Sequence, residues 1–237
     1  ERAAEMGADV IETEIHSTAD NNMVLIHDKT VDRTTNGTGP VNSFTLAELK
    51  ELDAGYKWTT DGGRTFPFRG KGITVPTLEE VFTGLPNIPI NIDIKQITPS
   101  LAAPLCKMIH KFDGVDTVMV ASFSTKAIKE FRRACPLIAT SASRREVTQF
   151  FLMNRLFLGS AYRPACRALQ VPEYSSGLHV LTKRFLHTAH SLNLGVHVWT
   201  INEVVDMKRL LELGVDGIIT DYPDRLISLL SDMELRP

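Results

Sequence analysis

Short runs of apolar residues alternate with longer amphipathic segments along most of this chain. The apolar runs are rich in β-branched residues and predict strands at about 10–15, 89–95, 117–122, 137–141, 167–171, 195–200 and 216–220. Helical periodicity predicts helices near 100–112, 124–134, 144–156, 182–193, 203–213 and 223–232. Strands that alternate with helices at this spacing are typical of parallel βα units.

Seven such strands predict an α/β fold, a (β/α)8 TIM barrel that lacks its first strand. The chain opens without Met, on a segment that resembles a helix end at Gly7. We therefore expect the sequence, residues 1–237, to begin inside a single barrel domain. An open doubly wound sheet is the alternative, but no glycine-rich phosphate-binding turn follows any predicted strand.

Residues 28–88 interrupt the alternation of strands and helices. This insertion follows the His27–Asp28 hairpin and contains several glycine-rich turns, with short helices predicted at 45–52 and 77–82. Loops at the carboxyl ends of barrel strands carry the active sites of such enzymes. We therefore expect the insertion to lie over the functional site.

Composition and charge exclude several classes of partner. The chain has 237 residues, 43% of them hydrophobic, and a formal net charge of −2. This content suffices for one large core. No basic field or stretch predicts binding to nucleic acid or to an anionic membrane surface. No apolar run is long enough for a transmembrane helix, and the oligomeric state cannot be read from the sequence.

The three cysteines are Cys106, Cys135 and Cys166. Their wide spacing and odd number predict neither a metal-ligand pattern nor a disulfide framework. They favour a reducing compartment, and we expect a cytoplasmic or membrane-associated location.

Three carboxylates carry the candidate chemistry. Side chains alternate along a strand, so Glu12 and Glu14 share one face of theirs, as Asp93 and Lys95 do. A carboxylate among apolar strands must be paired or bound to a cation. Oxygen ligands suit Mg²⁺ or Ca²⁺. The alternative is a set of ion pairs with Lys95 and arginines.

Three further features have two interpretations each. His27 ends the apolar run 23–26 and is either structural or an acid/base residue, and Asp28 could orient it, although adjacent residues usually face apart. Trp199 alternates with valines and lies either in a pocket wall or in the core. The apolar run 150–158 either packs on the barrel or forms a partly exposed lip that meets a lipid chain.

The chain resembles the glycerophosphodiester phosphodiesterases over almost its whole length. The matching motifs, which occur in the family's order, are Gly7–Glu14, His27–Asp28, Arg33–Thr35 with Gly37 and Gly39, Pro76–Val81, Asn91–Lys95, Leu169–Pro172, Val198–Asn202 and Gly214–Asp221.

The resemblance implies a barrel with an insertion after its second strand. It also implies hydrolysis of glycerophosphodiesters to sn-glycerol 3-phosphate and an alcohol with a divalent cation. It assigns the metal to Glu12, Glu14 and Asp93, and catalysis to His27 and Lys95. Contact with a small-molecule or lysolipid substrate falls to Gln170 and Trp199. The alternatives are a lysophospholipase D acting on lipid glycerophosphodiesters and a non-catalytic barrel that binds anions.

The chain departs from the family pattern in three places. It has no His-Arg-Gly strand, which would supply a second catalytic histidine, so we expect the chain as it stands to be poorly active and the complete protein to be an enzyme. Glu12 and Glu14 form Glu-Thr-Glu where Glu-x-Asp is usual, and Asp93 stands where Glu is frequent. These exchanges affect the expected metal geometry.

Overall fold

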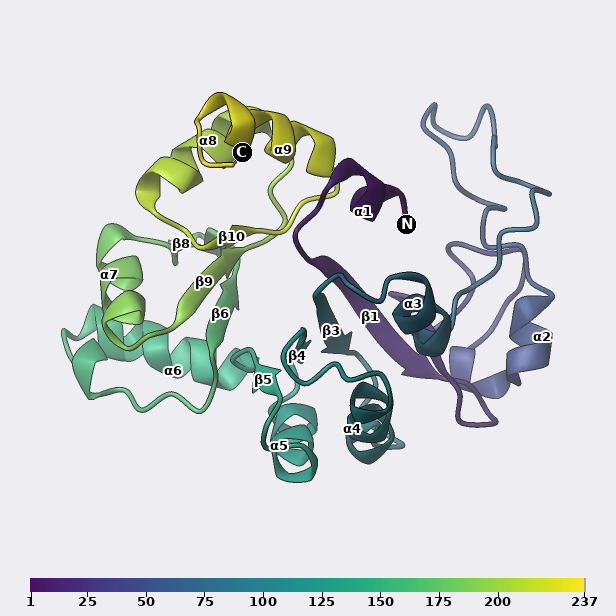
Figure 1. The fold of residues 1–237 in the computed structure, drawn as a ribbon, viewed down its shortest axis with the longest axis horizontal. Coiled ribbons are helices and arrows are strands. Elements are labelled where there is room, and N and C mark those ends of the chain that lie inside the picture. The colour runs from purple at the N-terminus through teal and green to yellow at the C-terminus, as the bar shows by residue number, and fades with distance from the viewer. Residues whose placement is uncertain (237) are drawn as a thin grey trace.

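A ring of parallel strands with helices outside it forms the frame of this protein, in a computed structural model that describes residues 1–236 (Figure 1). The parallel strands are β1 (Ile11–Ser17), β3 (Ile90–Ile94), β4 (Val118–Ala121), β5 (Ala139–Thr140), β6 (Ala168–Val171), β9 (Gly195–Val198) and β10 (Gly217–Ile218). They pair in the orders β1-β3-β4-β5 and β6-β9-β10, and a parallel bridge from Ser141 to Ala168 joins the two groups. Among the described residues no ladder connects β10 to β1, so the ring is open there. The predicted strands are confirmed.

The long helices follow the strands as predicted. They are α4 (Ala102–Lys111), α5 (Thr125–Ala134), α6 (Arg144–Arg155), α7 (Lys183–Ser191), α8 (Val204–Leu213) and α9 (Pro223–Asp232). The short helix α1 (Arg2–Met6) ends at Gly7, which has φ 98° as a helix-terminating glycine requires. Its end is tied to the chain's other end because Arg236 pairs with Asp9 at 3.1 Å. No helix in the described part of the chain is long and apolar enough to span a bilayer.

The insertion forms a small layer of its own beside β1 (Figure 1). It contains η1 (Val41–Ser43), α2 (Leu46–Lys50) and α3 (Leu78–Gly84), and it follows β2 (Met23–Leu25), which runs antiparallel to β1. Reciprocal capping boxes start α2 at Thr45 and α3 at Thr77. A separate apolar cluster, which includes Val31, Leu49 and Val75, holds the part before α3 together, while Leu78 and Phe82 of α3 join the main core. The remaining short elements are η2 (Gly159–Ala161), β7 (Tyr174–Ser175) and β8 (Leu178–His179).

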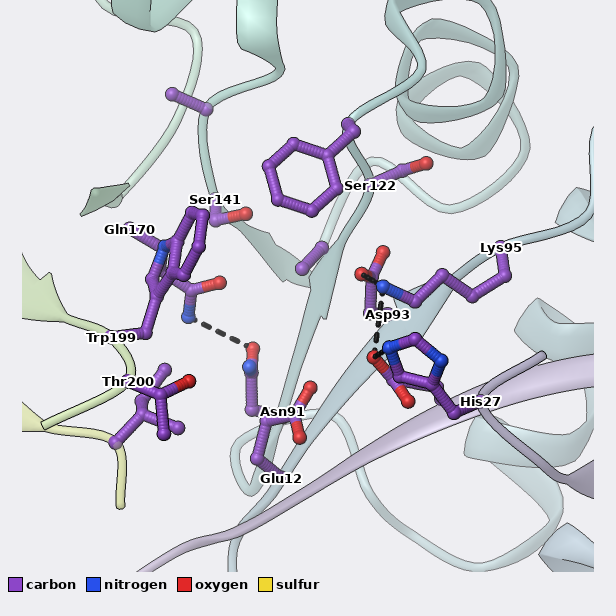
Figure 2. A pocket seen from close by; sticks show the side chains of 15 residues that line it. Glu12, His27, Asn91, Asp93, Lys95, Ser122, Ser141, Gln170, Trp199 and Thr200 are labelled. Atoms are coloured by element: carbon purple, nitrogen blue, oxygen red, sulfur yellow. Dashed lines mark hydrogen bonds and ion pairs between the residues drawn. The ribbon is translucent and has the colours of Figure 1, made fainter. Parts of the chain in front are cut away.

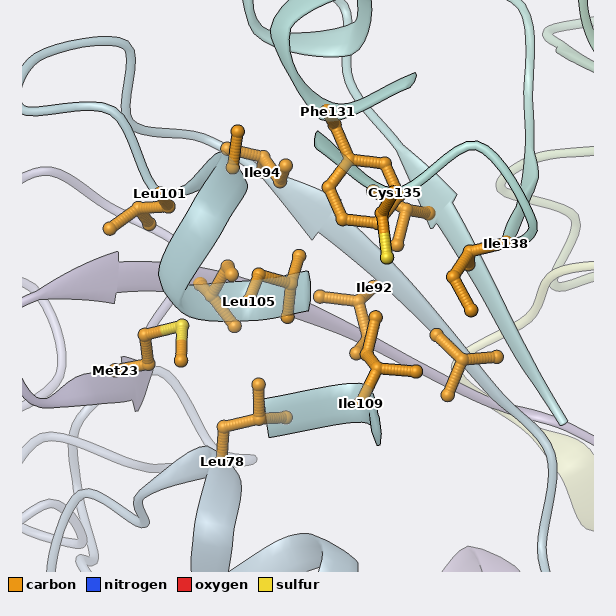
Figure 3. Close-up of a cluster of buried hydrophobic side chains, with 14 of the residues drawn as sticks. Met23, Leu78, Ile92, Ile94, Leu101, Leu105, Ile109, Phe131, Cys135 and Ile138 are labelled. Carbon is orange, nitrogen blue, oxygen red and sulfur yellow. The ribbon is translucent and has the colours of Figure 1, made fainter. Parts of the chain in front are cut away.

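The core lies between the strands and the outer helices. Strand alternation sends Ile92 outward, where it joins Leu105 of α4 and Phe131 of α5 in one cluster (Figure 3). A second cluster under α6 and α7 is centred on Phe150 and Phe185. Each fully buried side chain of this size contributes about 1.5–3 kcal/mol. Because the apolar side chains of each strand face outward, the polar side chains that alternate with them line the interior of the ring.

A disulfide joins α4 to the end of α5, so the prediction of no disulfide is wrong. Cys106 and Cys135 are bonded, with their Cα atoms 5.6 Å apart and 29 positions apart in sequence, while Cys166 is free and buried. The pairing arises because adjacent barrel helices pack side by side, which the cysteine spacing does not reveal. The cysteines therefore no longer favour a reducing compartment.

We expect reduction of this disulfide to lower the free energy of unfolding by about 3–4 kcal/mol, because the cross-link restricts a loop of this length in the unfolded chain. The measurement is urea unfolding with and without reductant. The C106A/C135A double variant is the control, and its midpoint should not respond to reductant. Equal midpoints for oxidised and reduced wild-type protein would contradict the expectation.

Candidate active site

A cavity of about 240 Å³ opens at the carboxyl ends of the strands. It brings together every residue that the sequence nominated: Glu12, Glu14, His27, Asp93, Lys95, Gln170 and Trp199 (Figure 2). No residue of the insertion 28–88 lines it. The insertion instead lies beside the cavity, where its first residues, Asp28 and Arg33, hold His27 at the cavity edge.

The pairing of β1 with β3 sets the carboxylates side by side. In this parallel register Glu14 lies opposite Asp93, and Glu12 lies opposite Asn91. All four alternate with isoleucine or threonine residues and share the interior face. Two adjacent strands thus bring three negative charges to one wall of the cavity.

Lys95 neutralises part of this charge. Its Nζ lies 2.8 Å from Glu14 Oε1 and 2.8 Å from Asp93 Oδ2, so one ammonium bridges two strands. The other Asp93 oxygen, Oδ1, is buried without a hydrogen-bond partner. A buried, unpaired carboxylate oxygen beside two glutamates is a donor set that fits a hard divalent cation.

Crowding and loss of water alter the acidity of these groups. Although Glu12 keeps an exposed surface, desolvation raises the pKa of its carboxyl to about 7, with repulsion from Glu14 and Asp93 adding to the effect. Burial also raises the pKa of Asp93. Burial opposes the charge on Lys95, but hydrogen bonds to Asp93 and Glu14 outweigh it and raise the pKa of the ammonium. The site is short of positive charge.

His27 is held at the cavity edge by a chain of polar contacts. Its Nδ1 lies 2.6 Å from Asp28 Oδ1, and Arg33 Nε donates to Asp28 Oδ2 at 2.6 Å. The Arg33 guanidinium, followed by His27, lowers the pKa of Asp28 to about 2. The adjacent residues therefore do face each other, contrary to the usual pattern. The remaining nitrogen, Nε2, lies 3.6 Å from Glu14 Oε1 and faces the carboxylates.

Aromatic and amide side chains form the opposite wall of the cavity. Trp199 packs edge-to-face on Phe123 at 5.6 Å, and Gln170 Nε2 donates to Asn91 Oδ1 at 3.1 Å. Sequence reasoning missed Asn91 and Phe123. Asn91 could have been found, because it alternates with Asp93 on the same face. Phe123 follows β4 in a loop without any motif.

Carboxylates, a lysine and a histidine that converge at the carboxyl ends of the strands are typical of the active sites of TIM-barrel enzymes. The Glycerophosphoryl diester phosphodiesterase family model matches residues 1–225. A glycerophosphodiester phosphodiesterase of Caldanaerobacter subterraneus subsp. tengcongensis is 34% identical over 97% of this chain and 88% of its own length. The chain belongs to the glycerophosphodiester phosphodiesterase family.

More distant similarities extend over the same region. The human protein named lysophospholipase D GDPD1 is 23% identical over 97% of this chain and 79% of its own length. The glycerophosphoryl diester phosphodiesterase domain of Mycobacterium tuberculosis Rv2277c superposes with a TM-score of 0.82 at 19% identity, over 98% of this chain and 91% of that one. An Oleispira antarctica phosphodiesterase in complex with the product sn-glycerol-3-phosphate superposes with a TM-score of 0.72 at 21% identity, over 97% of this chain and 88% of that one. These structures share the fold.

The raised pKa of Glu12 predicts a pH-dependent stability of the metal-free protein. Because the folded-state pKa lies above the ordinary value of 4.5, the group's contribution is fully present below 4.5 and is lost as the pH rises through about 7. Glu12→Gln should therefore raise the melting temperature at about pH 8 and leave it nearly unchanged at about pH 4.

The measurement is thermal unfolding in EDTA, then with Mg²⁺ or Ca²⁺ at the higher pH. The cation should stabilise the wild-type protein more than the Glu12→Gln variant. Glu212→Gln, at an exposed position of α8, is the matched control. A Glu12→Gln effect that does not change with pH would contradict the assignment.

Proposed function

We propose that this protein hydrolyses glycerophosphodiesters to sn-glycerol 3-phosphate and an alcohol with the help of a divalent cation. The observation that carries the proposal is the buried, unpaired Oδ1 of Asp93, set among Glu12, Glu14, Lys95 and His27 in one cavity. The names of the relatives support the same reaction, as does the product bound to the Oleispira antarctica phosphodiesterase.

Glu12, Glu14 and Asp93 are the residues that would hold the cation. Their all-oxygen donor set favours Mg²⁺ or Ca²⁺ over softer metals. When bound, such an ion neutralises the anionic phosphodiester, whose charge otherwise repels a nucleophile. Lys95, already placed between Glu14 and Asp93, adds a fixed positive charge for the non-bridging phosphate oxygens.

His27 is the proton-transfer residue of this proposal. Asp28, kept ionised by Arg33, fixes the ring through Nδ1 and leaves Nε2 facing the cavity. From there Nε2 can take a proton from the attacking hydroxyl or give one to the leaving alkoxide. If the substrate's own glycerol 2-hydroxyl attacks the phosphorus and the alkoxide leaves, a cyclic phosphate forms, and water then opens it to sn-glycerol 3-phosphate. Trp199 and Gln170 form the wall against which the glycerol moiety would rest.

His27→Ala should lower the turnover of glycerophosphocholine about 100-fold or more, because the proton transfer at Nε2 is lost. The measurement, made on the chain with a His-Arg-Gly strand joined to its N-terminus, is release of sn-glycerol 3-phosphate with Mg²⁺, Ca²⁺ or EDTA, and EDTA should abolish it. His187→Ala, at an exposed histidine of α7, is the matched control. If the His27→Ala variant retained its rate, His27 would not be the proton carrier. No release by folded, metal-bound protein would support the anion-binding barrel instead.

A second substrate class, the lysoglycerophospholipids, is supported by a groove that starts at the cavity mouth. Phe123 borders both the cavity and this groove, which continues along α6 past Thr148, Leu152 and Leu156. The cavity has room for a glycerophosphate headgroup, so an acyl chain would have to leave by such a path. Of the predicted lip, Phe151 packs against the core while Leu152 is exposed.

Leu152→Ser should therefore lower activity on lysophosphatidylcholine by about 10-fold, since several buried methylene contacts are lost. Activity on glycerophosphocholine, which has no acyl chain, should stay unchanged. The two substrates are compared at the same protein and metal concentrations. Equal loss on both substrates, or loss on neither, would rule out the groove as the acyl site.

A further inference from the structure

The end of α6 presents three consecutive large apolar side chains to solvent. Leu156, Phe157 and Leu158, here called the α6 tip, are 68%, 80% and 54% exposed. The same helix packs inward through Phe150 and Asn154, so its orientation is fixed. Single exposed apolar residues are ordinary, but a contiguous exposed set marks an interaction surface.

The backbone of the tip is ordered and strained. The Phe157 N–H donates to Asn154 O at 3.2 Å, and the Leu158 N–H donates to Met153 O at 2.8 Å. This pair of bonds defines a Schellman helix end, in which the residue at the position of Phe157 is usually glycine. Phe157 has φ 61°, a left-handed conformation that bulky side chains disfavour. Folding alone would favour glycine here, so the exposed ring has another role.

Basic side chains surround the tip. The Arg184 guanidinium lies 4.2 Å from the centre of the Phe157 ring, and Arg155 immediately precedes the tip. Arg163 donates to Ser160 O at 3.2 Å in the turn that follows. These arginines and the exposed Lys183 next to Arg184 are here called the basic rim. Residues 144–184 contain seven Lys or Arg and two Asp or Glu, a net charge of +5, whereas the rest of the chain has −7.

The two acidic residues of this segment do not neutralise the rim. Glu146 pairs with Arg132 at 2.6 Å, and Glu173 pairs with Arg209 at 2.7 Å, so both are occupied by cations from outside the segment. The surface therefore combines an apolar tip with uncompensated positive charge. That combination fits the interface of a bilayer that contains anionic lipids.

We propose that the α6 tip and its basic rim bind the surface of anionic phospholipid membranes. The apolar side chains enter the headgroup region, while the guanidinium groups pair with lipid phosphates. A second copy of the chain fits this surface poorly, because a two-fold contact would set one basic rim against the other. The groove along α6 runs from Leu156 to Phe123 at the cavity mouth, so docking brings that mouth close to the lipid.

Co-sedimentation of the whole chain with vesicles tests the proposal. Binding to phosphatidylcholine vesicles that contain phosphatidylglycerol should exceed binding to pure phosphatidylcholine vesicles by about tenfold, and high salt should weaken it. Equal binding to both vesicle types, or no binding to either, would overturn the proposal.

Phe157→Gly is the decisive variant, because it removes the ring and relieves the strained backbone. It should lose vesicle binding by about tenfold while its melting temperature stays the same or rises. Leu137→Ser, which alters another large exposed residue (76% exposed) outside the segment, should bind like wild type.

Unchanged binding by Phe157→Gly would refute the role of the tip. Sedimentation velocity tests whether a second copy of the chain binds the α6 tip instead. If the wild-type chain is a dimer and the Phe157→Gly variant is a monomer, the tip is a self-interface and the proposal is overturned. Turnover of glycerophosphocholine does not enter either readout, so the result is independent of the proposed catalytic function.

Discussion

The bridge from Lys95 to Glu14 and Asp93 is the interaction on which the site depends. Parallel pairing of β1 with β3 brings the carboxylates together as a direct consequence of the strand register. One ammonium cannot balance three carboxylates. Desolvation, followed by repulsion from Glu14 and Asp93, raises the pKa of Glu12, and burial raises the pKa of Asp93, whose Oδ1 has no hydrogen-bond partner. The strand pairing that builds the ring thus also creates the demand for positive charge.

Much of the ring could be predicted because local pattern and tertiary structure agree there. Apolar residues alternate with polar ones in β1 and β3, and amphipathic helices follow each strand, so every element points to the same fold. The sequence pattern agrees less well with the structure where contacts with other parts of the fold determine the local conformation. The region 137–141 reads as a full strand, yet its ladder to β4 includes only Ala139 and Thr140. The position of the insertion beside the cavity was not specified by the sequence, because glycine-rich turns do not determine the direction in which a layer packs.

The candidate site was predictable to the extent that it follows from strand alternation. Glu12, Glu14, Asp93 and Lys95 are brought together by period and register alone. Gln170 entered only through the family resemblance, whereas alternation with valines had already marked Trp199 as a pocket or core residue. The contact between His27 and Asp28 depends on the turn after β2, which turns neighbouring side chains toward each other. Phe123 and the disulfide between α4 and α5 depend on how loops and helices pack. Neither feature leaves a periodic signal in the sequence.

The basic surface was not predicted because the net charge is summed over the whole chain. A net charge of −2 suggests a nearly neutral molecule, but it is the difference between a basic segment and an acidic remainder. The field that a partner meets depends on where the charges lie, not on their sum. An averaged property of the sequence also hides the local setting of Phe157. Hydropathy counts it as one more apolar residue, and only the backbone shows that it occupies a glycine position with its ring exposed. Where a residue opposes both the local backbone preference and the burial of apolar surface, selection for folding does not explain it, whereas the proposed docking on a membrane would.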